Sequence, residues 1–524
     1  MKKSNKQNTP LILIILDGWG LAEPNKGNAV ESADTPVMDW LYKKYPHTEL
    51  FAHGKHVGLP ANQPGNSEAG HMNIGAGRMV LQDSVKINKA IKDGTFEKNP
   101  AFLGAVRHVK ELDSKLHLIG LLSSKSSPHV DPEHLYNLLK FLEEHKIKKV
   151  YLHFFTDGRD SPQYSALKLV RAFEKKYGNK FKIATIIGRF YAMDRKQEWG
   201  RTMKAYNALV AGEGKKAKSA SGAIAASYGE GDSDEFIDPC IIENNKENSR
   251  IEDKDSIIFF NLRSDRARQL SRVFAQKNFN EENYEFKRVK ELKRIYFVSL
   301  TNFGLELDNV ITAFPDIDLE NTLPMVLRDI KQLYIAESEK YAHVTYFFNG
   351  GYRDLVDKEK RIMVSSPNVR SYDITPAMSS LKITEIVLED LKKKKFDFIT
   401  VNFAAPDMVG HTGNLVASIA CCEAVDKCVG RIVKDYLKEK GTIIITADHG
   451  NVEKMIDLKT GELFTEHTVN KVPFVIVNDK LKNKIKLKKQ GALSDISPTI
   501  LDLLNHKKPT EMNGESLFYG KINL

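Results

Sequence analysis

The chain has 524 residues, which is too many for one ordinary hydrophobic core, so we expect two domains. Its hydrophobic fraction of 41% and charged fraction of 28% are typical of a soluble globular protein, and no apolar run approaches the roughly 20 residues of a membrane span. The net charge of +10 raises the question of nucleic acid, but many lysines lie in runs typical of solvated faces and no nucleic-acid motif is present, so we expect no such partner.

The cysteines and the start of the chain indicate the compartment. The cysteines form neither a disulfide framework nor a zinc spacing. The first residues are polar and lead directly into a strand, which is not the pattern of a secretory signal. We therefore expect a reduced, cytoplasmic protein with no membrane partner.

The first expected strand is the apolar run at residues 11–16, whose continuous hydrophobicity is typical of a parallel strand buried on both faces. It ends at Asp17. Ligands collect at the carboxyl ends of strands in open α/β sheets, so Asp17 is placed to be a ligand. A turn-forming aspartate before glycine is the alternative interpretation.

A stretch rich in glycine follows at residues 64–78, with Ser67 between Asn66 and Glu68. This composition predicts a tight loop that enters a helix. Such a loop can hold a hydroxyl forward, with the backbone N–H groups of the helix directed at an anion. A plain surface turn is the alternative.

Helices and strands alternate beyond residue 81. The expected strands, at residues 116–122, 150–156, 181–187 and 257–260, each precede polar residues, and the last three lead into arginines. Because arginine suits bidentate contact with phosphate or carboxylate, the sequence predicts an anion site at this sheet edge. Surface ion pairs are the alternative for any single arginine. We expect residues 219–249 to be irregular and residues 295–300 to form the last strand of this part.

Two later strands also lead into acidic and histidine residues. The strand at 396–403 precedes Asp407 and His411, and the strand at 442–446 precedes Asp448 and His449. With Asp17, one sheet edge would gather three carboxylates, whose mutual repulsion divalent cations would resolve. His411, His449 and His467 would add nitrogen ligands, a mixture suited to manganese, zinc or other first-row ions. The adjacent Asp448 and His449 could serve two metals, and buried structural histidines are the alternative for each histidine.

A serine beside such metals becomes a nucleophile, because coordination lowers the pKa of its hydroxyl. Two metals also neutralise the charge on a phosphoryl group during transfer. The sequence therefore predicts phosphoryl transfer at Ser67.

Stretches along nearly the whole chain resemble those of one known family, in the family's order. They are residues 16–20, 65–78, 157–160, 188–195, 263–266, 339–345, 402–413, 446–450 and 467–470. On these motifs the chain resembles the cofactor-independent phosphoglycerate mutases of the alkaline phosphatase superfamily. The resemblance implies two α/β domains, with a second α/β substrate domain inserted in an alkaline-phosphatase-like metal domain. The metal domain would comprise residues 1–81 and 314–524, and the inserted domain residues 82–313.

The resemblance also implies the activity. The enzyme would interconvert 3-phosphoglycerate and 2-phosphoglycerate through a phosphoserine at Ser67, with two Mn²⁺ ions and without 2,3-bisphosphoglycerate. Mg²⁺, Co²⁺ and Zn²⁺ are alternative ions, and a monomer is expected. The ligands of one metal would be Asp17, Ser67, Asp448 and His449. Those of the other would be Asp407, His411 and His467.

The substrate residues implied by the resemblance lie mostly in the inserted domain. They are His129, Arg159, Asp160, Arg189, Arg195, Arg263 and Arg266, with Lys340 contributing from the metal domain. Asp160 would also carry protons at the glycerate hydroxyls. The domains would close around substrate at hinges near residues 79–84 and 313–316. The chain departs from the family pattern at residues 123–131, around His129, and at residues 299–303.

Two other functions remain open at this stage. A metal-dependent phosphatase or another phosphomutase of the superfamily would share the metal residues and differ in the inserted domain. A binding relative without catalysis should lack a ligand or the nucleophile, and none of these is missing.

Overall fold

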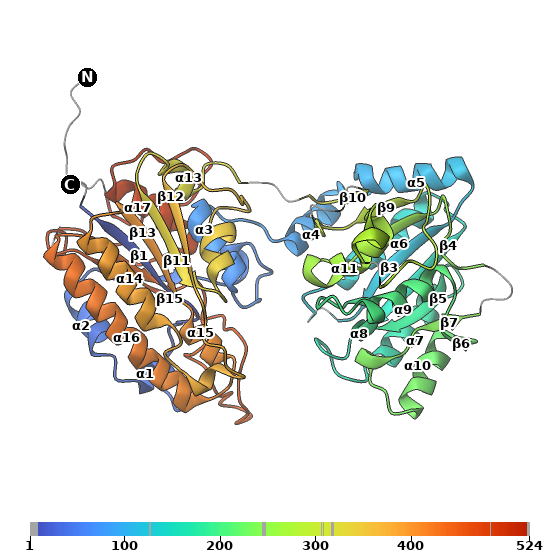
Figure 1. The fold of residues 1–524 in the computed structure, drawn as a ribbon, viewed down its shortest axis with the longest axis horizontal. Helices are drawn as coiled ribbons and strands as arrows, with labels where there is room; N and C mark the ends of the chain where they lie inside the picture. The colour runs from blue at the N-terminus through green and yellow to red at the C-terminus, as the bar shows by residue number, and fades with distance from the viewer. Residues whose placement is uncertain are drawn as a thin grey trace, which may run out of the picture. The chain divides into compact units, whose positions relative to one another are not determined.

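The computed structural model describes residues 9–124, 127–243, 248–283, 285–304, 307, 309–315, 319–482 and 484–520. The chain forms two units, each around its own sheet (Figure 1): unit 1 comprises Met1–Gln82 and Ile317–Leu524, and unit 2 comprises Asp83–Asp316. The expected fold class of two α/β domains is confirmed. Asp316, in the second expected hinge, lies outside the described residues.

Unit 1 is built on an eight-stranded sheet with the strand order β12-β11-β13-β1-β14-β15-β2-β16. The fully buried β1 pairs in parallel with β13 on one side and β14 on the other. β15 runs antiparallel to β14 and β2. The strands are β1 (Leu11–Leu16), β2 (His47–Phe51), β11 (Gln332–Glu337), β12 (Glu359–Val364), β13 (Phe398–Phe403), β14 (Thr442–Thr446), β15 (Val472–Val477) and β16 (Gln490–Ala492).

The helices of unit 1 cover this sheet. They are α1 (Ala29–Ser32), α2 (Pro36–Lys44), α3 (Ser67–Ala76), α13 (Leu323–Val326), α14 (Ser380–Lys392), α15 (Ala405–Gly410), α16 (Leu415–Lys438) and α17 (Ile496–Leu503). The long α16 packs against α14 (Figure 1). The Asp426 carboxylate of α16 accepts hydrogen bonds from the backbone N–H groups of Val37 (3.1 Å) and Met38 (2.8 Å), which stabilises the N-terminus of α2.

Unit 2 contains a second eight-stranded sheet, in the order β10-β9-β8-β3-β4-β5-β7-β6. Its strands are β3 (Leu116–Leu122), β4 (Val150–Thr156), β5 (Lys182–Gly188), β6 (Lys215–Ala217), β7 (Cys240–Ile242), β8 (Ser256–Phe259), β9 (Tyr296–Ser299) and β10 (Val310–Thr312). Its helices are α4 (Asp83–Asp93), α5 (Pro100–Leu112), α6 (Pro132–Glu144), α7 (Ala166–Tyr177), α8 (Arg189–Ala192), α9 (Trp199–Val210), α10 (Ala220–Gly229), α11 (Ser264–Ala275) and α12 (Phe279–Glu282).

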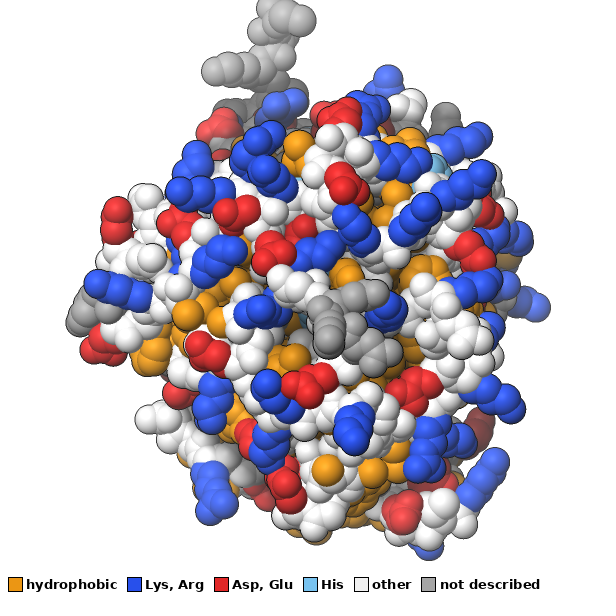
Figure 2. Space-filling model, turned by 90° about the vertical axis from the view of Figure 1, so that its right-hand side faces the viewer, with side chains coloured by type: hydrophobic (Ala, Val, Ile, Leu, Met, Phe, Trp, Pro, Cys, Tyr) orange, Lys and Arg blue, Asp and Glu red, His pale blue; other side chains and the backbone are white. Residues whose placement is uncertain are grey.

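Basic side chains are spread over the face shown in Figure 2, with acidic and apolar ones between them. Among the described residues, none of the helices combines the length and hydrophobicity that crossing a membrane requires.

Two expectations about unit 2 are wrong. Residues 219–249, expected to be irregular, contain α10 and β7. Alanine favours helix in this stretch, and the Ser219 hydroxyl caps α10 by accepting from the Gly222 N–H at 3.1 Å. The strand at residues 295–300 is not the last one either, because β10 follows it and pairs with β9 in parallel.

A chain of buried polar groups crosses the unit 2 sheet. His117 Nε2 lies 3.1 Å from Asp255 Oδ2, and His117 Nδ1 lies 3.0 Å from His153 Nε2. His153 Nδ1 lies 3.1 Å from the hydroxyl of Thr185. Burial lowers the pKa of both histidines from 6.5, that of His153 most strongly, so both imidazoles stay neutral in the folded protein.

We expect acid to destabilise unit 2 through this chain. Below about pH 6.5 the histidines of the unfolded state bind protons, whereas those of the folded state do not. Each histidine therefore lowers the free energy of unfolding by up to about 1.4 kcal/mol for every pH unit below this value. Thermal denaturation of the full chain between pH 7.5 and 5 measures this dependence. His153→Gln should flatten it, and an equal slope in both proteins would contradict the assignment.

Candidate metal centre and arginine pocket

The position of Ser67 is set by the glycine-rich loop. Ser67 is the first residue of α3, and the Asn66 side chain caps this helix by accepting from the Ala69 N–H at 2.9 Å. A β-carbon at Gly65 would lie 2.1 Å from the Ala52 carbonyl oxygen, and one at Gly70 would lie 2.6 Å from the Asp448 carbonyl oxygen. Glycine at these two positions therefore allows α3 to approach the loop after β14.

Three aspartates follow the adjacent strands β13, β1 and β14. Asp17 follows β1, Asp407 lies in α15 directly after β13, and Asp448 follows β14. Because these strands are parallel, their carboxyl ends meet at one edge of the sheet. All three side chains are buried. Such a group of carboxylates requires positive charge nearby.

In a first cluster, Asp407 faces two histidines. His411 Nε2 lies 3.4 Å from Asp407 Oδ1, His467 Nε2 lies 3.2 Å from the same oxygen, and the two nitrogens lie 3.1 Å apart. His411 Nδ1 donates to the Thr465 carbonyl oxygen at 2.8 Å, and His467 Nδ1 donates to that of Gly65 at 2.8 Å. A neutral imidazole with its proton on Nδ1 has a lone pair on Nε2. Three electron-pair donors therefore converge on one point, as at a metal site.

A second cluster surrounds the Ser67 hydroxyl. Ser67 Oγ lies 2.9 Å from His449 Nε2 and 3.3 Å from Asp17 Oδ1. His449 Nε2 also lies 3.5 Å from Asp448 Oδ2, an oxygen that His71 Nδ1 approaches to 3.2 Å. The adjacent Asp448 and His449 therefore point into the same cluster.

Lys340 lies between the two clusters. Its Nζ donates to Asp17 Oδ1 at 2.8 Å, to Ser67 Oγ at 2.7 Å and to Asp407 Oδ2 at 2.6 Å. Burial alone would lower the pKa of Lys340, but the neighbouring carboxylates outweigh it and raise that pKa. Burial and the Asp448 charge raise the pKa of Asp17 to about 6. The clusters thus hold more negative charge than one ammonium balances, which fits divalent cations.

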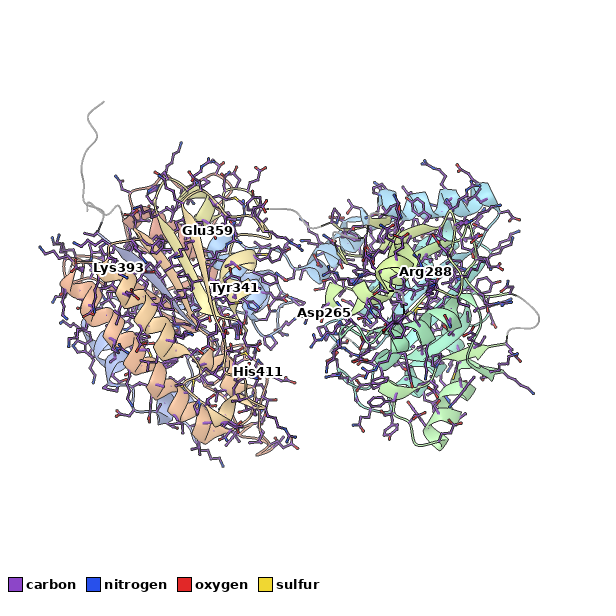
Figure 3. All side chains as sticks on the ribbon, in the orientation of Figure 1. Asp265, Arg288, Tyr341, Glu359, Lys393 and His411 are labelled. Carbon is purple, nitrogen blue, oxygen red and sulfur yellow. The ribbon has the colours of Figure 1, made fainter. Side chains whose placement is uncertain are left out.

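Among the described residues, three groups have donor atoms close enough together to hold a metal ion: Asp407–His411–His467, Asp17–Asp407–His449 and Asp17–His71–Asp448. Together these groups contain every expected metal ligand except Ser67. The Ser67 hydroxyl contacts two of the ligands, Asp17 and His449. Figure 3 labels His411 in unit 1.

Unit 2 contains a pocket of about 240 Å³ at the carboxyl ends of its strands. It is lined by Pro128, His129, Arg159, Asp160, Arg189, Arg195, Arg263, Asp265 and Arg266. Five arginines against two aspartates make this lining strongly basic, which suits an anionic ligand. Each inserted-domain residue expected to hold substrate lies in this pocket.

Hydrogen bonds to aspartates hold two of the arginine side chains in the pocket. The buried Arg189 donates from Nη1 to Asp157 Oδ1 and to Asp160 Oδ2, each at 2.6 Å. Arg195 donates to Asp265, labelled in Figure 3, at 2.9 Å. His129 Nε2 lies 3.6 Å from Asp160 Oδ2, and burial together with the Arg189 charge lowers the pKa of His129 to about 4. His129 is therefore neutral near pH 7.

The comparisons with known proteins cover nearly the whole chain. The family model described as the Metalloenzyme superfamily matches residues 9–508. A 2,3-bisphosphoglycerate-independent phosphoglycerate mutase from Acetivibrio thermocellus is 45% identical over 512 residues, or 97% of this chain and 98% of the relative. One from Clostridium kluyveri is 48% identical over 515 residues, with 97% of this chain and 99% of the relative covered. The chain is a member of this mutase family.

A solved structure agrees with this membership. It is described as Leishmania mexicana phosphoglycerate mutase at low cobalt concentration. It matches with a TM-score of 0.76 and 28% identity, and it covers 98% of each chain.

Some residues of this mutase family member were not predicted as site residues. Asp157 and Asp265 hold pocket arginines, and His71 lies beside Asp448. All three lie within the sequence stretches that resemble the mutase family, so their position in these stretches could have marked them as candidate site residues. In the altered loop at residues 123–131, Lys125 and Ser126 lie outside the described residues.

Proposed function

We propose that this protein interconverts 3-phosphoglycerate and 2-phosphoglycerate, a step of glycolysis and gluconeogenesis, through a phosphoserine at Ser67. The observation that carries the proposal is the setting of Ser67 Oγ, at the start of a helix and within 3.3 Å of His449, Asp17 and Lys340. The named relatives and the basic pocket of unit 2 support the same reaction.

The proposal assigns two divalent ions to unit 1. Asp407, His411 and His467 would hold one ion. The other would take Asp17, Ser67, Asp448 and His449. Mn²⁺ is the proposed ion, with Mg²⁺, Co²⁺ or Zn²⁺ as alternatives. When bound, these ions supply charge neutralisation for the serine oxygen and the phosphoryl group.

The protein groups of unit 1 prepare the nucleophile. The capping of α3 by Asn66 fixes Ser67 at the helix N-terminus, where the backbone N–H groups favour an anion. The ammonium of Lys340, 2.7 Å from Ser67 Oγ, would neutralise charge on the transferring phosphoryl group. Lys340 is therefore placed to stabilise negative charge both on the Ser67 oxygen and on the phosphoryl group that it would receive.

Unit 2 would hold the glycerate part of the substrate. Its arginines would bind carboxylate and phosphate oxygens, which arginine contacts in a bidentate manner. Asp160 would take and return the protons of the glycerate hydroxyls. Its contact with Arg189 orients it, and the neutral His129 lies beside it. Retention of glycerate between the two transfers distinguishes a mutase from a phosphatase.

The direct test is an assay of the purified full chain with 3-phosphoglycerate and Mn²⁺, in the absence of 2,3-bisphosphoglycerate. We expect 2-phosphoglycerate to form without release of inorganic phosphate. Release of phosphate at the rate of substrate loss would identify a metal-dependent phosphatase instead. No conversion under any of the four ions would favour a non-catalytic relative. We further propose a cytoplasmic monomer.

A further inference from the structure

The buried His71 and Asn402 take no part in the chemistry above. We propose that they form a positioning pair that orients the carboxylates of Asp17 and Asp448 for metal binding, and that His71 itself binds no metal. This inference rests on the proposed metal centre of unit 1.

The pair connects the nucleophile's helix to both carboxylates. His71 lies on α3, one turn after Ser67, with Nδ1 2.9 Å from the Ser67 carbonyl oxygen and 3.2 Å from Asp448 Oδ2. Asn402 lies on β13, and its Nδ2 donates to Asp17 Oδ2 at 2.7 Å and contacts His71 Nε2 at 3.0 Å. Both side chains are fully buried.

The carboxylate of Asp17 determines the orientation of the Asn402 amide. If the amide were turned over, its oxygen would face Asp17 Oδ2, and two acceptors would be in contact. The amide nitrogen therefore faces Asp17, and its second hydrogen points at His71 Nε2. His71 Nε2 must then accept, so the imidazole proton is on Nδ1.

This tautomer uses both nitrogens of His71. Nε2 accepts from Asn402, and Nδ1–H donates to the Ser67 carbonyl oxygen beside Asp448. The proposed ligands His411 and His467 differ, because in each a backbone carbonyl holds Nδ1 and Nε2 faces Asp407. Asp17, His71 and Asp448 lie close enough to resemble a ligand group. The hydrogen bonds assign His71 to the support of that group instead.

Hydrogen-bonded partners of metal ligands reduce the freedom of the ligand oxygens, and their loss commonly weakens metal binding by roughly 10–100-fold. Loss of the Asn402 amide would free Asp17 Oδ2 and leave His71 Nε2 unpaired. Since His71 contacts the Ser67 carbonyl, the same loss would also loosen the nucleophile's helix turn. His71 and Asn402 would thus orient both the carboxylates that would hold the ion and the helix turn that carries Ser67.

The test measures Mn²⁺ binding to the metal-stripped full chain by titration calorimetry. Asn402→Leu keeps the side-chain size and removes both donors. We expect this variant to bind as many ions as the wild type at saturation, with about 10–100-fold weaker affinity for one of them. In assays at saturating Mn²⁺, we expect kcat to fall while the KM for 3-phosphoglycerate changes less than about twofold, because unit 2 holds the substrate.

The matched control is Thr400→Val. Thr400 is buried on the same strand, two residues before Asn402, and its hydroxyl has no hydrogen-bond partner among the described residues. This control should bind Mn²⁺ as the wild type does. If it weakens binding as much as Asn402→Leu, the effect belongs to strand packing and the inference fails.

Two variants of His71 separate positioning from ligation and carry the test if Asn402→Leu does not fold. His71→Gln can still accept from Asn402 and should bind Mn²⁺ within about threefold of the wild-type affinity, whereas His71→Leu should lose roughly 10–100-fold. Loss of one bound ion in both variants would show that His71 is a ligand and overturn the inference. Wild-type affinity in both variants would overturn it too. A wild-type chain that binds no Mn²⁺ would also overturn the metal part of the proposed function.

Discussion

Ser67→Ala is expected to lower the rate of 3-phosphoglycerate interconversion by at least about 10⁴-fold, because a route through a covalent intermediate has no substitute nucleophile. The variant should fold normally and keep Mn²⁺ bound, since Asp17, Asp448 and His449 remain. Coupled assay of 2-phosphoglycerate formation measures the effect.

Quenching the wild-type enzyme during turnover and mapping the phosphopeptide should place the phosphoryl group on Ser67. Ser418→Ala, which removes a buried hydroxyl of α16, is the matched control and should remain active. A phosphoryl group on any other residue would refute the assignment of the nucleophile.

His467→Ala is expected to remove one bound Mn²⁺ per chain and to lower activity by at least about 10³-fold, since a catalytic metal supplies several kcal/mol of transition-state stabilisation. The physical reason is the convergence of His467 Nε2 with His411 Nε2 and Asp407 Oδ1. Metal analysis after gel filtration at fixed free Mn²⁺ gives the number of ions.

The control for this change is His47→Ala, which removes an exposed histidine of β2 in the same unit. It should keep both ions and its activity. A His467→Ala protein that still holds two ions with wild-type affinity would exclude His467 as a ligand.

The fold was predictable wherever the hydrophobic pattern was continuous. β1, β3, β4 and β14 have the bounds expected from their apolar runs, because strands buried on both faces admit few polar residues. β10 was missed because its three residues are partly exposed and show no such pattern. α10 was missed because serines and glycines obscure its alanines, and only the cap at Ser219 fixes where it begins.

The site was predictable in its residue types and less so in its contacts. Asp17, Asp407 and Asp448 could be located because each directly follows a recognisable strand. The partners of His71 and Asn402 could not, because they depend on how α3 lies against β13 across 331 positions of sequence. The position of Lys340 between the carboxylates of both clusters likewise follows from tertiary packing and not from spacing.

The central position of β1 has a consequence for how the protein is made. Its partners β13 and β14 begin at Phe398 and Thr442, so at about 5–20 residues per second the ribosome delivers them roughly 20–90 s after β1. During this interval the apolar segment Leu11–Leu16 lacks both neighbouring strands, while all of unit 2, a continuous segment, is synthesised and can fold. Nascent unit 1 therefore exposes an aggregation-prone strand for most of translation, and this is the stage at which a chaperone would bind.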